Sequence, residues 1–235
     1  MIKNLIDLTS CFNIRLFKEL FYKLYIPIFV LFLIIIVVGY ENKIGIAVFT
    51  RDPAVIASDR KIIPLIDPKH NPFIGVVSQI GILFWCISAS LSLFCSVIVA
   101  RKKNLYLDLS NFLGCFGLLT SFLLLDDLFM LHESIFPELL KISEKATYSC
   151  YALLIIGGLV KFKKIILQTE WTILLLSFFW FFCSISTDLV SESITFSGIA
   201  KHLHFLLEDG FKLLGIVTWF YYCLRVCLSS TKKII

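Results

Sequence analysis

Long apolar runs separated by short polar segments make up most of the sequence. A helix needs about 20 apolar residues to cross the ~30 Å hydrocarbon core of a bilayer, and most of these runs approach or exceed that length. The run at 146–160 is shorter and reaches across only if residues 142–145 extend it. The pattern predicts an all-α fold, a polytopic bundle of about six transmembrane helices. The expected spans lie near 24–39, 74–100, 105–131, 146–160, 171–190 and 205–224.

The segment before the first run is amphipathic. Within residues 1–23, Leu8, Phe12 and Leu16 recur about one helical turn apart among basic residues. This spacing predicts a helix that lies on the inner membrane surface. No small-residue cleavage signal closes the first span, so we expect it to be retained as an anchor.

The longest polar segment, 41–73, is expected to be an extracytoplasmic loop. In it Asp52 precedes Pro53, a pair that marks the start of a helix with Asp as N-cap and Pro at the first helical position. At the other end of the chain, residues 226–235 are expected to form a cytoplasmic tail. The six-helix membrane domain between these parts is expected to occupy 24–225.

Basic residues gather on one side of the predicted membrane. Four Lys or Arg residues precede the first span, and three follow each of the second, fourth and sixth spans, so this side holds 13 of the 22. Only four of the 17 acidic residues share it. Because Lys and Arg are enriched in cytoplasmic segments, both termini are expected in the cytoplasm.

Composition agrees with a membrane protein and excludes a soluble domain. Hydrophobic residues make up 58% of the chain and charged residues 17%, whereas a soluble domain carries about a quarter charged residues. The net charge of +5 does not indicate nucleic-acid binding, because the basic residues stand in short clusters between apolar runs. The expected partner is the lipid bilayer.

Polar residues cluster at the outer ends of the third, fifth and sixth spans, which reach the same membrane face in this topology. Within the sixth span His204, Glu208 and Lys212 follow each other at four-residue intervals and predict a continuous stripe. Asp126 and Glu133 lie two turns apart and are expected to share a helix face. The full set of candidates is Asp126, Asp127, His132, Glu133, Asp188, His202, His204, Glu208, Asp209 and Lys212, with Asp52 approaching from the loop.

The charges of this set do not balance. Four carboxylates lie about one turn inside the apolar boundary, and Lys212 is the cation nearest to them within a span, which leaves a formal charge of −3. Each ionised carboxylate in a span costs about 2.5–3.5 kcal/mol. Shared protons, a metal ion, a cationic ligand or water could relieve the surplus.

Of these ways to compensate the negative charge, a divalent metal ion is the one that would also support catalysis. Imidazole and carboxylate ligands suit Zn²⁺, Mn²⁺ or Fe²⁺. The spacing is not that of a known motif, because the sequence has no His-Glu-x-x-His and no Glu-x-x-His pair. The expected metal ligands are His132, His204, Asp126, Asp127 and Glu208, with Glu133 or Asp209 as general base.

Three strings resemble an uncharacterised family of bacterial multi-pass membrane proteins. They are FTRDPA at 49–54, LLLDDLFMLHE at 123–133 and LLEDGFKLLGI at 206–216. The resemblance covers most of the chain and implies a bacterial plasma membrane location, without a reaction. The chain is also similar, in fewer features, to membrane hydrolases of the alkaline ceramidase type. It departs from them in having about six spans instead of seven, and in its His202-Leu203-His204 arrangement.

Three functions therefore stay open. The first is a metal-dependent hydrolase acting on a lipid-like or other small membrane-accessible substrate through a metal-bound water. The second is a small transporter, in which the acidic cluster binds a cation or passes protons and Lys212 is the counter-charge. The third is a non-catalytic membrane subunit whose polar span ends hold the helices together.

The topology can be tested with reporter fusions. We expect fusions after Lys103, Lys164 and Lys233 to report a cytoplasmic location, and fusions near Lys61 and Ser143 to report the outside, because the basic clusters stay in the cytoplasm. A fusion near Ser197 should also report the outside. A cytoplasmic signal near Ser143 would contradict the six-span topology.

Overall fold

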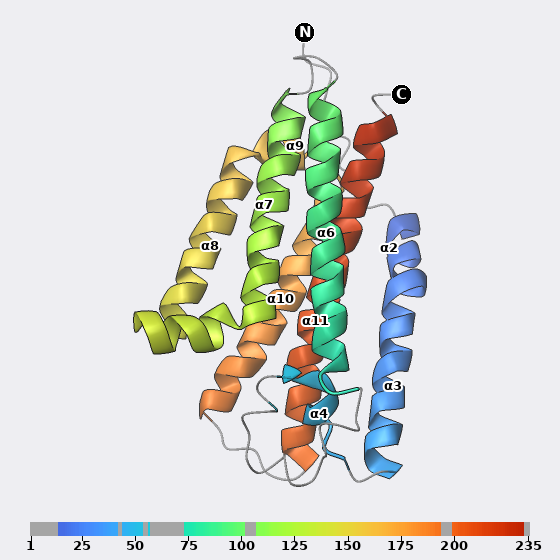
Figure 1. Cartoon of the computed structure of the whole chain (residues 1–235). Helices are drawn as coiled ribbons and strands as arrows, with labels where there is room; N and C mark the ends of the chain where they lie inside the picture. The colour runs from blue at the N-terminus through green and yellow to red at the C-terminus, as the bar shows by residue number, and fades with distance from the viewer. Residues whose placement is uncertain are drawn as a thin grey trace. The chain divides into compact units, whose positions relative to one another are not determined.

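A computed structural model describes residues 14–41, 44–53, 56, 73–101, 107–193 and 199–232, and every element in these ranges is helical (Figure 1). The all-α prediction is confirmed for this part of the chain. The first elements are α2 (Ile14–Leu20), the π-helix η1 (Phe21–Tyr25), α3 (Ile26–Glu41), α4 (Ala47–Thr50) and α6 (Val76–Ala100). The later ones are α7 (Leu107–Phe129), the π-helix η4 (Leu131–Leu140), α8 (Glu144–Lys161), α9 (Lys163–Ile166), α10 (Trp171–Ser193) and α11 (Ile199–Lys232).

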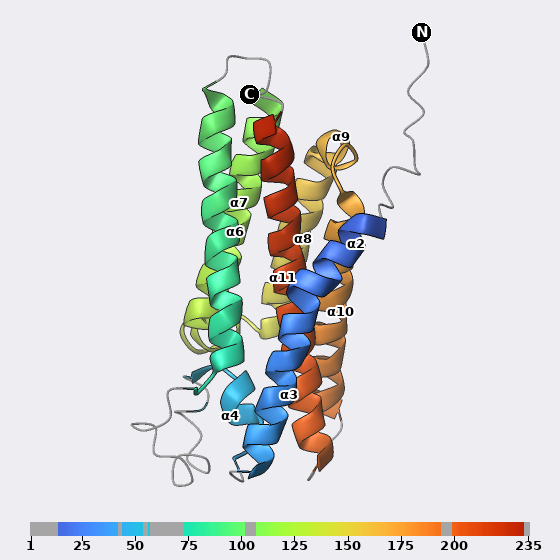
Figure 2. The same ribbon diagram turned by 90° about the vertical axis from the view of Figure 1, so that its right-hand side faces the viewer.

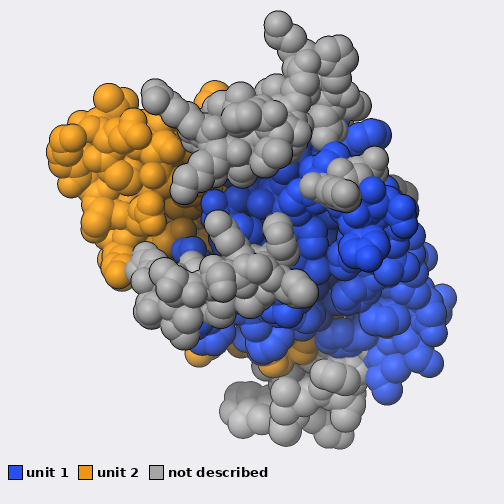
Figure 3. Space-filling view, turned by 90° about the horizontal axis from the view of Figure 1, so that it is seen from below, with its two compact units in different colours: residues 1–81, 174–218 blue, residues 82–173, 219–235 orange. Residues whose placement is uncertain are grey.

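The chain forms two compact units, where the sequence suggested one membrane domain over 24–225. Unit 1 comprises residues 1–81 and 174–218, and unit 2 comprises residues 82–173 and 219–235 (Figure 3). The boundaries fall inside α6, α10 and α11, so these three helices contribute to both units.

Among the described residues, five helical segments have the length and apolarity needed to cross a bilayer. Large apolar side chains on them are exposed, such as Leu33 at 61% and Phe94 at 65%, as expected where lipid is the solvent. The chain is therefore an integral, multi-pass membrane protein. α8, the remaining expected span, does not qualify, because its 18 residues include Glu144, Lys145 and Lys161. The five segments are Ile14–Glu41, Val76–Ala100, Leu107–Phe129, Trp171–Val190 and Leu203–Lys232.

α2, η1 and α3 form one continuous helix from Ile14 (Figure 2). By length and apolarity the first candidate span is Ile14–Glu41, which includes residues 14–23 of the expected interfacial helix. Residues 1–13 of the expected amphipathic helix lie outside the described part. Pro27 explains the π-helical turn, because it lacks the N–H that an α-helix needs there. The Ile26 N–H bonds to Phe21 O, five residues back.

In unit 1, η1 places Tyr25 against α10 and α11. Trp180 Nε1 donates to the Tyr25 hydroxyl (2.9 Å), and Tyr25 and Thr218 share a hydrogen bond of 2.6 Å. Thr218 uses its single proton on Leu214 O (2.6 Å), so Tyr25 must be the donor to Thr218. The buried polar groups thus form a directed chain that ties three helices together.

Serine hydroxyls on α10 join it to α11 in the same unit. Ser177 donates to Gly215 O (2.9 Å) and Ser184 donates to Glu208 O (3.0 Å), a register that makes the two helices antiparallel. Gly215 permits the close approach, because a Cβ there would lie 2.7 Å from the Phe181 ring. Small residues and interhelical hydrogen bonds are the usual means by which helices associate in membranes.

In unit 2 the core forms around Trp219 of α11. Its ring stacks on Phe116 of α7, with centroids 4.5 Å apart, and meets Trp85 of α6 edge-on at 5.8 Å. The indole N–H donates to Thr120 on α7 (3.1 Å). Trp219 is fully buried, so this single side chain joins α6, α7 and α11.

Two ring contacts set the direction of α8. Tyr151, near the middle of the helix, meets Phe122 of α7 at 5.4 Å between ring centroids, and Phe162, just after its end, meets Phe112 at 5.5 Å. α8 therefore runs antiparallel to α7 along most of its length (Figure 1).

The direction of α11 is fixed in the same way. Phe220 meets Phe84 of α6 at 5.2 Å, and further along Cys227 Sγ donates to Leu91 O (3.7 Å), so α11 and α6 are parallel. α6 and α7 are antiparallel neighbours, joined by Ser96 and Ser110, each of which donates to the other's carbonyl (2.9 and 3.0 Å).

Two glycines offer a matched test of packing. Gly75 has φ +64°, and a Cβ there would lie 2.6 Å from Pro53, so Gly75→Ala should lower stability by at least about 1–2 kcal/mol through left-handed strain alone. In α8, a Cβ added at Gly157 would meet no atom within 4 Å, so Gly157→Ala should be neutral or stabilise by up to about 1 kcal/mol. Thermal unfolding in detergent measures both, and equal effects would contradict the packing described.

Candidate functional site

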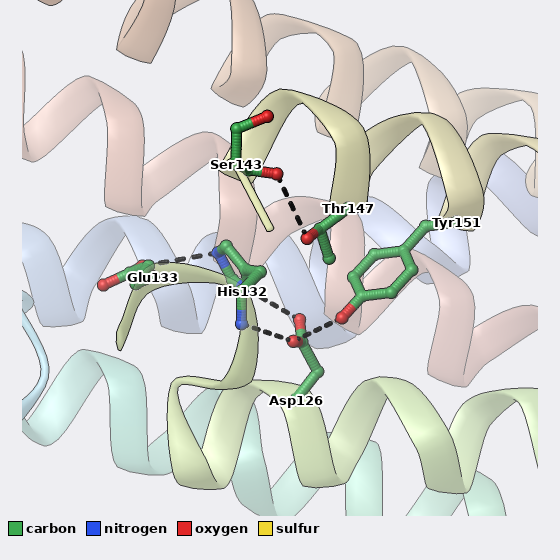
Figure 4. A network of polar contacts seen from close by, with 6 residues as sticks. All are labelled: Asp126, His132, Glu133, Ser143, Thr147 and Tyr151. Atoms are coloured by element: carbon green, nitrogen blue, oxygen red, sulfur yellow. Dashed lines mark hydrogen bonds and ion pairs between the residues drawn. The ribbon is translucent and has the colours of Figure 1, made fainter. Parts of the chain in front are cut away.

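The first polar cluster lies in unit 2, where α7 ends. α7 stops at Phe129, and Met130 takes a left-handed conformation (φ 49°) that a helix cannot continue. The N–H groups of Ser134 and Ile135 then bond to Met130 O (2.9 and 3.3 Å). This turn brings His132 back over Asp126 (Figure 4).

Asp126 is held from three directions. His132 Nδ1 donates to Oδ2 (2.7 Å), and the His132 backbone N–H donates to Oδ1 (3.1 Å). The Tyr151 hydroxyl of α8 donates to the same Oδ1 (2.6 Å). Asp126 and His132 are buried, so the carboxylate has lost its hydration, and these hydrogen bonds replace it.

The other imidazole nitrogen also faces an acid. His132 Nε2 lies 3.5 Å from Glu133 Oε1, and the ring packs against Tyr148 at 5.1 Å. Burial disfavours the charged imidazole, but the interactions with Asp126 and Glu133 outweigh it and raise the pKa of His132 from 6.5 to about 9. At neutral pH the ring is an imidazolium that donates from both nitrogens.

Both imidazole nitrogens of His132 thus face carboxylates of the same unit. Neither nitrogen is directed at an open position beside the cluster where a substrate proton or a metal ion would lie. The hydroxyl of Thr147, which lies beside the ring in Figure 4, donates to Ser143 O (3.3 Å). That hydroxyl proton is therefore also used within the chain.

The second cluster lies in unit 1, on α11 and the segment after α4. His204 Nε2 lies 3.0 Å from Thr187 O, and a carbonyl only accepts, so this nitrogen carries a proton. His204 Nδ1 lies 3.5 Å from Glu208 Oε2. The predicted stripe is confirmed for this pair, since α11 is continuous through Lys212.

The segment after α4 brings charge to this stripe. The Arg51 guanidinium lies 4.3 Å over the Phe205 ring, and the Ser78 hydroxyl donates to Asp52 Oδ1. Asp209 has Thr50, Arg51 and Lys212 close enough to act on its carboxylate. Of these residues, the buried Thr50 is a side-chain hydrogen-bond partner of the Asp209 carboxylate.

The structure does not support the expected metal site. In the ranges that the structure describes, no three His, Cys, Asp or Glu side chains are placed to hold a metal ion. His132 and His204 fall in different units and each has a partner of its own. Asp126 and Glu133 do not share a helix face, because Met130 ends α7 between them.

The charge surplus is also smaller than the sequence suggested. His132 lies beside Asp126 and Glu133 and offsets one of these two charges, and Arg51 joins Lys212 near Asp209. The sequence argument counted the carboxylates of both units against Lys212 alone. Local cations therefore weaken the charge argument for a metal.

Some candidates gain no role here. Asp127 is buried in α7 and Asp188 is half-buried in α10, while the side chain of His202 lies outside the described part of the chain. Tyr151 and Thr50 were missed by the sequence argument. Tyr151 stands inside an apolar run without a local spacing to Asp126, so only the packing of α8 on α7 could reveal it.

Stability should depend on pH through His132. Its folded pKa is raised, so its stabilising contribution is complete below about pH 6.5 and is lost as the pH rises through about 9. The loss amounts to roughly 3 kcal/mol in the buried limit. Melting curves of wild type and His132→Gln across this range measure it. An equal alkaline loss in His132→Gln would assign the dependence to another group.

One family model matches the chain, and it covers residues 25–226. Its description is a domain of unknown function, DUF8692. No curated protein and no solved structure matches the chain. The match spans both polar clusters and most of the described helices. The chain therefore belongs to the DUF8692 family.

Proposed function

We propose that the protein is a non-catalytic membrane subunit, in which the cluster around Asp126 and His132 holds the turn between α7 and α8. The main support is that both ring nitrogens and the backbone N–H of His132 interact with carboxylates of its own unit. Tyr151 adds a bond from α8 to the same acid. A helix, a reversed turn and the following helix are thus joined by one carboxylate.

The energetic argument favours a structural role. A buried ion pair contributes little compared with apolar packing, but removing one partner costs about 3–5 kcal/mol because the other charge stays buried. Asp126 and Tyr151 lie on different helices, so their bond specifies where α8 packs. Without it, α7 and α8 would be held mainly by apolar contacts, which discriminate poorly between registers.

The hydrolase and transporter hypotheses have less support. A catalytic metal site keeps an open coordination position, whereas both ring nitrogens of His132 face carboxylates of the same unit. The described part of the chain holds no set of metal ligands around this ring.

Helix directions support six crossings. α7 is antiparallel to α6, α8 is antiparallel to α7, and α11 is parallel to α6. If α8 stayed on one side, α10 and α11 would cross in the opposite senses and α11 would be antiparallel to α6. We therefore include α8 as a crossing, with both termini in the cytoplasm of a bacterium as the basic clusters and the resembled family suggest.

Metal analysis combined with stability measurements tests this function. We expect purified protein to carry metal at background level, with a melting temperature that a chelator does not change. Asp126→Asn should lower stability by about 3 kcal/mol, because it removes the buried counter-charge of His132. Glu133→Gln is the matched control on the outer side of the same ring, and its effect should stay below about 1 kcal/mol.

A different result would restore the enzyme hypothesis. Stoichiometric Zn²⁺, Mn²⁺ or Fe²⁺ that disappears in His132→Ala or His204→Ala would overturn the structural role. Equal effects of Asp126→Asn and Glu133→Gln would show that the buried pair does not hold the turn.

A further inference from the structure

The segment between α7 and α8 has a surface that the cluster around Asp126 does not use. Met130 (φ 49°) and Lys141 (φ 56°), both in the left-handed conformation, stand at its two ends and set the π-helix η4 apart from its neighbours. Figure 1 shows η4, in yellow-green, lying across the ends of α7 and α8 instead of along either helix. All three helices belong to unit 2. η4 is therefore a transverse helix with an orientation of its own.

The sequence of η4 is amphipathic in the period of a π-helix. Hydrogen bonds in a π-helix join residues five apart, so side chains four or five positions apart lie on one face. The apolar side chains follow this spacing, and they are Leu131, Ile135, Phe136, Leu139 and Leu140. The opposite face carries Glu133, Ser134, Pro137 and Glu138. In an α-helix Leu131 and Leu140 would lie on opposite sides, since nine residues make about two and a half turns. The π-helical winding thus gathers the apolar residues on one side.

The last turn of this apolar face is not covered by the described part of the chain. Leu139 is 75% exposed and Leu140 is 58% exposed, and Ile142, just beyond η4, is 40% exposed. His132, near the start of η4, is instead buried and packs against Tyr148 of α8. η4 is therefore attached to its unit at the first turn and presents leucines to the surroundings at the last.

The place of η4 along the chain puts this face at a membrane boundary. The segment Leu107–Phe129 has the length and apolarity of a bilayer crossing, and only Met130 separates its last residue from η4. Leu128 and Phe129 in the last turn of α7 are 47% and 55% exposed, as expected where acyl chains surround the helix. A transverse helix that begins one residue later lies at the boundary between acyl chains and headgroups, where an amphipathic helix buries its apolar face.

We propose that η4 is an interfacial helix whose apolar face lies on the bilayer. Leu139 and Leu140 enter the upper part of the acyl layer, and Glu138 faces water. η4 contains no Lys or Arg, so its contact with the membrane depends on apolar burial and does not need anionic lipid. The proposal does not rest on the role proposed for Asp126 and His132, because it concerns the side of η4 that faces away from this pair.

Thiol labelling in nanodiscs tests the proposal. Purified protein in phosphatidylcholine nanodiscs with one copy each is treated with a charged, water-soluble maleimide, and wild type with its native cysteines gives the background. Leu139→Cys and Leu140→Cys should be labelled at least about tenfold more slowly than Glu138→Cys, because the apolar layer excludes a charged reagent. The three positions are consecutive and all exposed, so the variants differ mainly in what surrounds the thiol. A nanodisc leaves both membrane faces accessible, so the result does not depend on topology.

Two controls calibrate the rates. Leu118→Cys, at the middle of α7 and 63% exposed, is the reference for a thiol within the acyl layer and should be labelled most slowly. After denaturation in sodium dodecyl sulfate all four variants should be labelled equally, which shows that each thiol is present and reduced. Replacing part of the phosphatidylcholine by phosphatidylglycerol should leave the ratio between the leucine positions and Glu138→Cys unchanged.

Several results would overturn the proposal. Equal labelling of Leu139→Cys, Leu140→Cys and Glu138→Cys would place the apolar face in water. Labelling of Glu138→Cys as slow as that of Leu118→Cys would mean that η4 is embedded on all sides. Protection that requires phosphatidylglycerol would assign the contact to charge. Protection in liposomes with many copies, but not in single-copy nanodiscs, would assign the face to a second copy of the chain.

Discussion

The cost of leaving a charge or a polar group unmatched near hydrocarbon is the constraint on which the rest of this structure depends. Asp126 shows how the constraint acts, because its carboxylate is buried and can be kept only if donors converge on it. Those donors come from the reversed turn after α7 and from α8. Matching one acid therefore decides where the chain turns and which helix returns along α7.

The same constraint applies to uncharged polar groups in the middle of the helices. Hydroxyls of α10 donate to carbonyls of α11. The Tyr25 hydroxyl accepts from Trp180 and donates to Thr218. In water such bonds would compete with solvent, but in a bilayer they are among the few specific contacts that helices have. They give unit 1 its register, while apolar side chains outside remain exposed to lipid.

The polar cluster in unit 1 is matched in a similar way. The carboxylate of Asp209 has Arg51 and Lys212 near it and a side-chain hydrogen bond with Thr50. Residues of α11 and residues in and after α4 thus meet at one buried acid.

The sequence alone determined the membrane location and the helical architecture, because apolar runs and their helical period depend only on residues that are neighbours along the chain. It also predicted the His204 and Glu208 stripe, since one unbroken helix joins these residues. It erred where the outcome depended on packing. Met130 separates Asp126 from Glu133 by ending α7, so these two acids do not share a helix face. Only the tertiary structure decided which donor or cation lies beside which acid. Tyr151, Arg51 and Thr50 reach their partners from elements that are distant along the chain. A charge count along the sequence contains no such distances, so it could not show that His132 lies beside Asp126 or that Arg51 joins Lys212 near Asp209, which makes the surplus smaller.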